Sequence, residues 1–226
     1  MAQMKLAPVM QGGADAFGVA NLAEARAIRS VGRGWPVLML GACIPGEVET
    51  CVKEGVMPTI SSVGEVAAFA AAARKLRRSV DVHLKVDTGM GRLGAAPDEA
   101  LAVAQEILRH DALKLHGLYT HFSSAEDDAE FSVQQAAAFS RVVAQLKNAG
   151  IQPALLHANN SAAILHEPGT TLDLVRPGLL IYGIVPTGSR RLAPPAPLWH
   201  AGWWLGNVPA IRQYLIAGQN YDWSIA

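Results

Sequence analysis

Short apolar segments alternate with longer segments of helical periodicity along most of the chain. The apolar segments predict strands at residues 17–20, 36–40, 57–60, 81–86, 113–119, 154–157 and 171–175, with residues 180–185 as a candidate eighth element. The intervening segments repeat apolar positions every three or four residues, as amphipathic helices do. Near-continuous apolar strands joined by helices are typical of a parallel sheet covered by helices. The pattern therefore predicts an α/β fold.

Several of the predicted helices begin at recognisable capping residues. Asn21 with Glu24, and Ser62 with Glu65, have the spacing of a capping box. Pro97 is suited to the first turn of the helix that follows the fourth strand. This many strand–helix units favours a (β/α)8 TIM-type barrel over an open doubly wound sheet. The sequence contains neither a GxGxxG motif nor a P-loop, which weakens a nucleotide-binding alternative.

Composition and charge narrow the class of protein. The chain has 226 residues, is half apolar and carries a formal net charge of zero, so nothing indicates a nucleic-acid or membrane partner. The two cysteines, Cys43 and Cys51, lack the spacing of metal ligands and favour a reducing compartment. No apolar run approaches the roughly 18 residues of a membrane helix, and no signal-peptide pattern is present. We expect a cytoplasmic protein.

The character of the sequence changes from about residue 192. Three prolines crowd together at positions 194, 195 and 197, and four of the five tryptophans lie beyond them, at positions 199, 203, 204 and 223. No strand–helix unit is readable there. We therefore expect a barrel over residues 1–190 and a short, irregular, divergent tail over residues 191–226.

Polar residues gather where the predicted strands end, which is where a parallel barrel carries its active residues. They are Lys85, Arg92, His121, His157, Asn160, Ser161, Arg176 and Gly178. This cationic set without an acidic cluster suits an anionic ligand, such as a phosphate with a carboxylate, and predicts no metal site. Arg92 lies in a glycine-rich stretch, and Ser161 precedes a short helix whose first N–H groups could hold a phosphate. The 176–179 stretch offers a second such place.

Each candidate also has a purely structural interpretation. Arg92 could be solvated in a surface turn, Ser161 could only cap a helix, and His157 could be a hydrogen-bonded strand end. Arg176 could form a salt bridge with Asp173. The remaining residues of this kind are interpreted as packing or incidental, namely Tyr119, Tyr182, His83, His110, His116, His166 and His200.

Four segments in register resemble bacterial alanine racemase. They are KVDTGMGRLG at residues 85–94, YTHF at 119–122, HANNSAA at 157–163 and DLVRPGL at 173–179. ADAFGVA at residues 14–20 also looks like the early strand–helix unit of that family. The resemblance covers roughly residues 13–188, and it implies a barrel that binds pyridoxal 5′-phosphate (PLP). It also implies interconversion of L- and D-alanine, which supplies D-alanine for cell-wall peptidoglycan.

The resemblance also assigns roles around the cofactor. Ser161, beside Asn160, and the backbone at Gly178 and Leu179 would hold the phosphate. Arg176 would face the pyridine nitrogen, and His157 would back it. Because an arginine keeps its proton, it cannot fully protonate that nitrogen, and the ring would be a weaker electron sink. Reprotonation at Cα is then favoured over side reactions.

The same resemblance assigns four residues to catalysis. Arg92 would meet the PLP phenolate and the substrate carboxylate. Lys85 matches a family lysine that is often carbamylated, and the carbamate would orient Arg92. His121 would tune the catalytic tyrosine. That tyrosine comes from the partner subunit of a homodimer, and Tyr221 in the stretch AGQNYDW is a gapped match to it.

Two features of the family pattern are missing. The family binds PLP through a lysine on its first barrel strand, in a motif like VKANAYGHG, which this sequence does not contain. The β-rich second domain is absent or reduced to the tail at 191–226. We therefore expect an incomplete PLP-binding barrel that lacks its first strand and shows little or no activity alone. Two alternatives are a single-domain PLP-binding or homeostasis barrel and a non-catalytic remnant that pairs with a full-length racemase subunit.

Overall fold

The structure, a computed structural model, describes residues 14–32, 34–166, 172–182, 184 and 186 and the backbone of residues 212–217. Its strands are β1 (Ala16–Val19), β2 (Val37–Met39), β3 (Met57–Ile60), β4 (Val80–Lys85), β5 (Leu113–Tyr119), β6 (Leu155–His157), β7 (Leu174–Val175) and β8 (Arg212–Ala217). Its α-helices are α2 (Leu22–Val31), α3 (Val48–Glu54), α4 (Val63–Leu76), α5 (Ala100–Leu108), α6 (Ala129–Asn148) and α7 (Ser161–His166). Two 3-10 helices are η2 (Pro45–Glu47) and η3 (Leu179–Tyr182).

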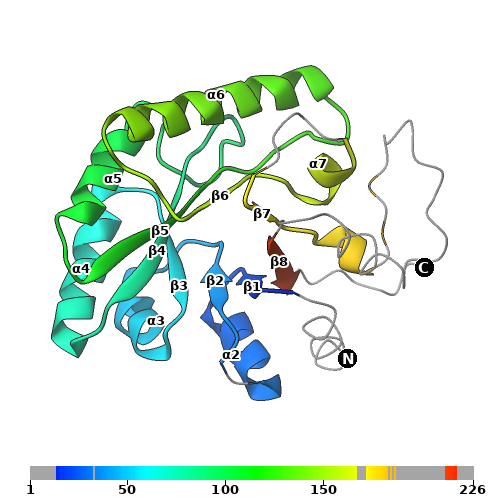
Figure 1. The fold of residues 1–226 in the computed structure, drawn as a ribbon. Coiled ribbons are helices and arrows are strands. Elements are labelled where there is room, and N and C mark those ends of the chain that lie inside the picture. The colour runs from blue at the N-terminus through cyan, green and yellow to red at the C-terminus, as the bar shows by residue number, and fades with distance from the viewer. Residues whose placement is uncertain are drawn as a thin grey trace.

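The described strands form a closed ring in the order β1 to β8, and all of their pairings are parallel. Strands β1 to β7 alternate with helices, and α4, α5 and α6 lie outside them (Figure 1). This confirms the predicted parallel β/α barrel.

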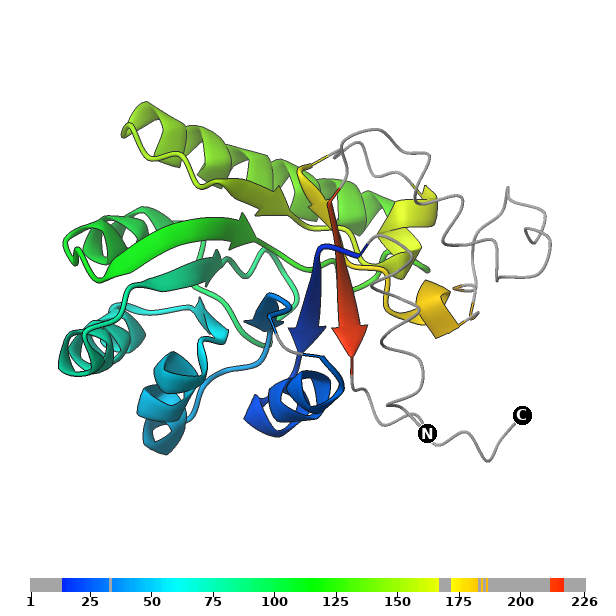
Figure 2. The same ribbon diagram turned by 60° about the horizontal axis from the view of Figure 1, so that its bottom comes forward.

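The place between β1 and β7 is taken by a strand from the C-terminal region. β8 pairs with β1 over four residue pairs and with β7 over two, and β1 and β8 run side by side in Figure 2. The expectation of a wholly irregular tail is therefore wrong for residues 212–217. Unpaired strand edges expose backbone N–H and C=O groups, and β8 satisfies the edges of both neighbours.

The predicted strand boundaries agree with the structure to within a few residues. The strands at residues 57–60 and 113–119 are confirmed, whereas the strand predicted from residue 171 begins at Leu174. The candidate element at 180–185 is not a strand over its first residues, which belong to η3. The N–H of Ile181 donates to the Gly178 carbonyl, and this bond turns the chain there.

The helix starts follow the predicted caps in two cases and depart from them in a third. The side chain of Asn21 accepts from the Glu24 N–H at 3.0 Å, and that of Ser62 accepts from the Glu65 N–H at 3.3 Å. Helix α5 begins at Ala100, and Pro97 lies in the turn before it.

The core lies between the ring and its helices. Phe17, Ile60, Val82 and Leu84 of the strands are fully buried, and Phe69 of α4 is 1% exposed. Because all of the strands are parallel, their carboxyl ends meet at one rim of the barrel. The candidate site lies at this rim.

Candidate functional site

The register of three neighbouring strands brings three side chains into one row. Two of them, Lys85 and His157, were predicted as site residues, whereas Tyr119 was not. Lys85 at the end of β4 pairs with Tyr119 of β5, and Tyr119 pairs with His157 of β6. Residues in register on adjacent strands project from the same face of the sheet. All three side chains are buried, and the Lys85 ammonium nitrogen lies 5.8 Å from the centre of the Tyr119 ring.

Arg176, which follows β7, is the cation at the centre of the site and is fully buried. Its Nη1 lies 2.5 Å from Nδ1 of His157, and its Nη2 donates to the carbonyls of Thr120 and Ala158, each at 2.8 Å. Burial lowers the pKa of Arg176 to about 10, against a smaller opposite effect of Tyr119. The guanidinium is therefore positioned by carbonyls and imidazole at a strand end.

The prediction of a salt bridge between Arg176 and Asp173 is wrong, because the Asp173 carboxylate binds the backbone of β6 instead. Its Oδ2 accepts the backbone N–H of Leu156 at 2.8 Å, which fastens the start of β7 to β6. Among the described residues, no hydrogen-bond partner reaches Nε of Arg176. The charge of Arg176 is therefore directed towards the site instead of being neutralised by a carboxylate.

His157 is hydrogen-bonded at the end of β6, as its structural interpretation expects, and its ring has two aromatic neighbours. Its ring stacks on that of Tyr119 at 4.5 Å between centroids and 7° between planes, and its Nε2 lies 2.9 Å from Nδ1 of His83. His83 is fully buried and in contact with His157, a contact that its interpretation as incidental did not include. Burial, followed by the charges of His116 and Arg176, lowers the pKa of His83 to about 3, and burial beside Arg176 also lowers the pKa of His157.

Tyr119 also departs from its interpretation as packing alone. Its hydroxyl lies 2.7 Å from the Thr59 hydroxyl and 3.5 Å from the carbonyl oxygen of Leu40. Burial raises its pKa to about 12, against the opposing hydrogen bond from Thr59. Tyr119 therefore stays a neutral phenol that joins the ends of β2, β3 and β5.

Lys85 is the buried lysine of the site, with 2% of its surface exposed. Burial, together with the smaller effects of the Arg92 and Arg176 charges, lowers the pKa of Lys85 to about 8, whereas the Asp87 charge opposes this shift. A neutral amine is the form that reacts with carbon dioxide, and a carbamate anion would relieve the repulsion among these cations. The site thus suits the modification that the resemblance implies.

Arg92 is exposed, and it belongs to a loop that Asp87 organises. Oδ1 of Asp87 accepts the backbone N–H groups of Gly89, Met90 and Gly91 at 2.9, 2.7 and 3.2 Å. Partial burial raises the pKa of Asp87, but these hydrogen bonds outweigh it and hold the pKa below its ordinary value. The loop keeps Arg92 close enough for its charge to act on Lys85 and Tyr119.

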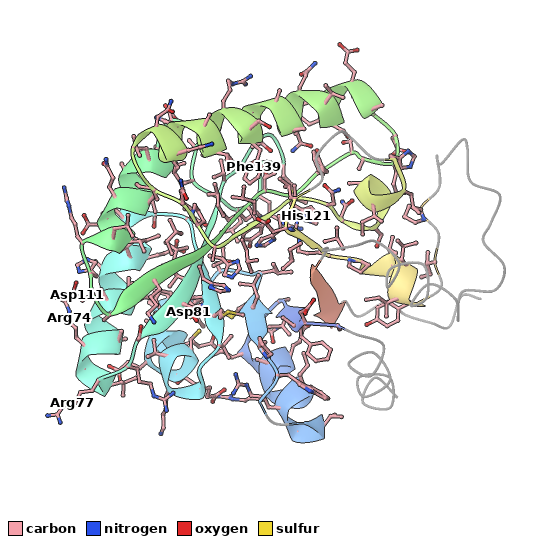
Figure 3. The ribbon with its side chains drawn as sticks, viewed as in Figure 1. Arg74, Arg77, Asp81, Asp111, His121 and Phe139 are labelled. Atoms are coloured by element: carbon pink, nitrogen blue, oxygen red, sulfur yellow. The ribbon has the colours of Figure 1, made fainter. Side chains whose placement is uncertain are left out.

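His121 lies beyond the end of β5, is half-buried and is near β6 and β7 (Figure 3). Its Nδ1 is 3.4 Å from Nη2 of Arg176. Burial and the charges of Arg176, Lys85 and Arg92 hold the pKa of His121 well below its ordinary value. An arginine cannot accept a hydrogen bond, so neutral His121 carries its proton on Nε2.

A buried amide on α6, that of Gln135, connects the Arg92 loop with the segment that follows β5 at His121. Sequence reasoning did not select Gln135. Its Nε2 donates to the carbonyl of His121 at 3.2 Å and to the Thr88 hydroxyl at 3.4 Å. Its Oε1 accepts the backbone N–H of Ser123 at 3.1 Å. Thr88 and Thr120 are joined by a hydroxyl pair at 2.7 Å.

The predicted phosphate residues Asn160 and Ser161 are neighbours at the start of α7, but the residue that caps this helix is not the predicted one. Oδ1 of Asn160 accepts the Ala163 N–H at 2.9 Å and so caps α7, which corrects the assignment of the cap to Ser161. Ser161 is the first helical residue, and its Oγ accepts the Leu180 N–H at 3.3 Å. Its hydroxyl proton is left to donate, near the start of η3 at Leu179.

The remaining expectations concern Tyr221, metals and membranes. Tyr221 lies outside the described residues. Across the described ranges, no group of three or more His, Cys, Asp or Glu side chains is arranged to hold a metal ion. No helix in the described part of the chain has the length and apolar character needed to cross a membrane.

Comparison with known proteins gives one consistent result. Residues 2–186 match the family described as "Alanine racemase, N-terminal domain". The alanine racemase of Treponema pallidum is 41% identical over 184 residues, which cover 77% of this chain and 48% of that protein. The chain therefore spans about half the length of the curated relatives that it matches.

Solved structures agree with the sequence match. An alanine racemase of Clostridium difficile 630 in complex with cycloserine superposes with a TM-score of 0.78 at 30% identity, over 83% of this chain and 52% of that one. A histidine racemase of Leuconostoc mesenteroides superposes with a TM-score of 0.77 at 25% identity, over 87% and 52%. Both amino-acid racemases share the barrel described above.

Proposed function

Because this chain belongs to the alanine racemase family, represented by its N-terminal domain, we propose that its barrel binds PLP for the interconversion of L- and D-alanine. The D-alanine would serve cell-wall peptidoglycan. As in the family, the working assembly would be a cytoplasmic homodimer. The residues at the rim of the barrel support this proposal through their charge, burial and hydrogen-bonding capacity.

The observation that carries the proposal is the buried guanidinium of Arg176. It is a desolvated cation whose hydrogen-bonding partners are carbonyls and histidines, and Nε has none among the described residues. A buried donor without an acceptor is costly, so an acceptor-bearing ligand would stabilise this site. The pyridine nitrogen of PLP is such an acceptor, and a guanidinium would hydrogen-bond to it without giving up its proton.

The other residues fit the rest of the same ligand. The Ser161 hydroxyl, with the backbone at Gly178 and Leu179, would hold the phosphate. When bound, PLP withdraws electrons from Cα of an amino acid and so makes its proton removable. Arg92 would bind the phenolate and the substrate carboxylate, and a Lys85 carbamate would orient its guanidinium.

His121 would act on a proton donor outside the barrel. Because its Nδ1 faces Arg176, its Nε2–H is the group free to donate to a tyrosine of the partner subunit. A hydrogen bond to a phenolate favours the ionised form and lowers the tyrosine pKa. This would bring the tyrosine into the range in which it can exchange a proton with Cα.

The test is PLP titration of the full chain, followed by absorbance. Arg176→Gln should weaken binding about tenfold or more, because one charged, buried hydrogen bond is lost. Arg74→Gln is the matched control, because Arg74 is exposed on α4. Binding of PLP to Arg176→Gln as tightly as to the unaltered chain would overturn the assignment.

Turnover is measured separately as D-alanine formed from L-alanine with added PLP. The chain lacks the family's lysine motif, so we expect little or no turnover by the chain alone and no PLP fixed to a lysine by borohydride. Turnover equal to that of an intact racemase would contradict this expectation. L-Histidine is the comparison substrate, since a histidine racemase shares the fold.

A second candidate is a PLP-binding barrel that does not racemise amino acids. It is favoured by β8, which closes the ring within this chain. PLP binding that is unchanged by added alanine, with no D-alanine formed in any mixture with a full-length racemase subunit, would select this candidate.

A further inference from the structure

A row of three buried side chains crosses the interior of the barrel behind the site. Nη1 of Arg176 meets Nδ1 of His157 at 2.5 Å, and Nε2 of His157 meets Nδ1 of His83 at 2.9 Å. None of the three side chains has measurable exposure. The row extends from the end of β7 through β6 to β4, which is two strands away from β6.

Gly117 of β5 makes this reach possible. It pairs in register with His83 on one side and with Leu155 on the other. A Cβ atom at Gly117 would lie 2.1 Å from Nδ1 of His83 and 2.4 Å from its Cε1. The imidazole of His83 therefore occupies the space that a side chain on β5 would fill, and through that space it reaches His157.

The chemistry of the three groups gives the row a direction. A guanidinium donates and never accepts, so Nδ1 of His157 must present its lone pair to Arg176. A neutral imidazole carries one proton, which then lies on Nε2 of His157 and points at His83. Nδ1 of His83 must accept it, so His83 also carries its own proton on Nε2.

From this geometry we infer that His83 is a positioning residue: by accepting the Nε2–H of His157 it holds that ring in the orientation in which Nδ1 accepts from Arg176, with Gly117 as its required neighbour. The effect on a cofactor rests on the PLP site proposed above. The assignment of the tautomers does not depend on that site. A carboxylate at the end of the row would offset the charge of Arg176, whereas two neutral imidazoles orient it and leave the charge in place.

The first test reads the tautomers directly. Nitrogen-15 NMR of the full chain at neutral pH should show an unprotonated Nδ1 and a protonated Nε2 for both His157 and His83. Signals are assigned by their loss in His83→Asn and His157→Asn, and His110→Asn serves as the control outside the row. A proton on Nδ1 of His157, or two protons on either ring, would overturn the inference.

The second test asks whether the row matters for binding of PLP. His83→Leu removes the acceptor and should weaken PLP binding about tenfold, the effect of one buried hydrogen bond. His83→Asn places an amide oxygen near the position of Nδ1 and should restore most of the affinity. Gly117→Ala should resemble His83→Leu, because its methyl group displaces the ring, and His110→Asn should bind as the unaltered chain does.

The thermal midpoint of each variant separates positioning from packing. A merely structural His83 would lower the midpoint in both His83 variants and would leave the PLP dissociation constants equal, which would overturn the inference. If the unaltered chain binds no PLP, the proposed function fails. The NMR result then still decides whether Nδ1 of His83 accepts the Nε2 proton of His157, as the inference requires.

Discussion

Lys85 should form a carbamate at a pH where an ordinary lysine scarcely does. Its pKa of about 8, against the ordinary value of 10.5, means that half of the Lys85 side chains are neutral amines at pH 8. At the ordinary pKa only about one lysine in 300 is neutral at that pH, so the reactive fraction is about 150 times larger for Lys85. The amine attacks carbon dioxide, forms the N–C bond and releases one proton.

The assay is carbon-13 NMR of the full chain in labelled bicarbonate, with Lys85→Met and Lys114→Met compared under the same conditions. Lys114 is exposed on β5 and controls for reaction at the surface. A carbamate signal should be present in the unaltered chain and in Lys114→Met and absent from Lys85→Met. A signal that survives in Lys85→Met, or that forms only above about pH 10, would refute the reasoning.

The same pKa predicts how stability depends on pH. The unfolded chain holds the Lys85 proton up to about 10.5 and the folded chain only up to about 8, so between these values the unfolded state binds more protons. The free energy of unfolding therefore rises with pH between about 8 and 10.5, by up to about 3 kcal/mol. Below about pH 8 the destabilisation caused by burying the charged Lys85 is fully present. Urea unfolding in carbon dioxide-free buffer should show this rise in the unaltered chain and lose it in Lys85→Met.

Three further substitutions test the loop, the bridge and the core. Asp87→Ala removes the acceptor of three backbone N–H groups, so amide exchange at Gly89 should accelerate at least about tenfold; an unchanged rate would contradict the role of Asp87. Gln135→Leu should cost about 2 kcal/mol in urea unfolding, because the hydrogen bonds of Gln135 to the 88 loop and to residues 121–123 are lost, and a loss below about 0.5 kcal/mol would contradict a connecting role of Gln135. Phe69→Ala should cost about 3–5 kcal/mol, whereas Val133→Ala at an exposed position should stay within about 0.5 kcal/mol.

The sequence predicted the rim of the site better than its interior. Lys85, His157 and Arg176 could be selected because parallel strands bring their carboxyl ends together, and that rule needs only the strand boundaries. His83 could not be selected in this way, because it lies within a strand. Its signal was nevertheless present: His83 precedes Lys85 by two residues, and Gly117 precedes Tyr119 by two. On the same face of two paired strands, the imidazole of His83 therefore lies beside Gly117, which has no side chain.

Gln135 was missed for a different reason. A polar residue on a long helix is ordinarily solvated, and nothing in its local sequence indicates that two loops will pack against that turn of the helix. Its burial is decided by Gly89, whose added Cβ would lie 2.7 Å from Cζ of Phe131. The loop approaches α6 closely only because a glycine stands there, so Gly89 and Gln135 have to be interpreted together.

Strand β8 shows where local sequence reasoning ends. Residues 212–217 read RQYLIA, which is apolar enough for a short strand, but such runs also occur in helices and irregular segments. What makes this segment a strand is the pair of open edges on β1 and β7, which are separated from each other by more than 150 positions in the sequence. Those edges exist only after the other seven strands have assembled, so the conformation of the segment depends on non-local pairing. A strand specified by its neighbours in this way cannot be recognised from its own residues.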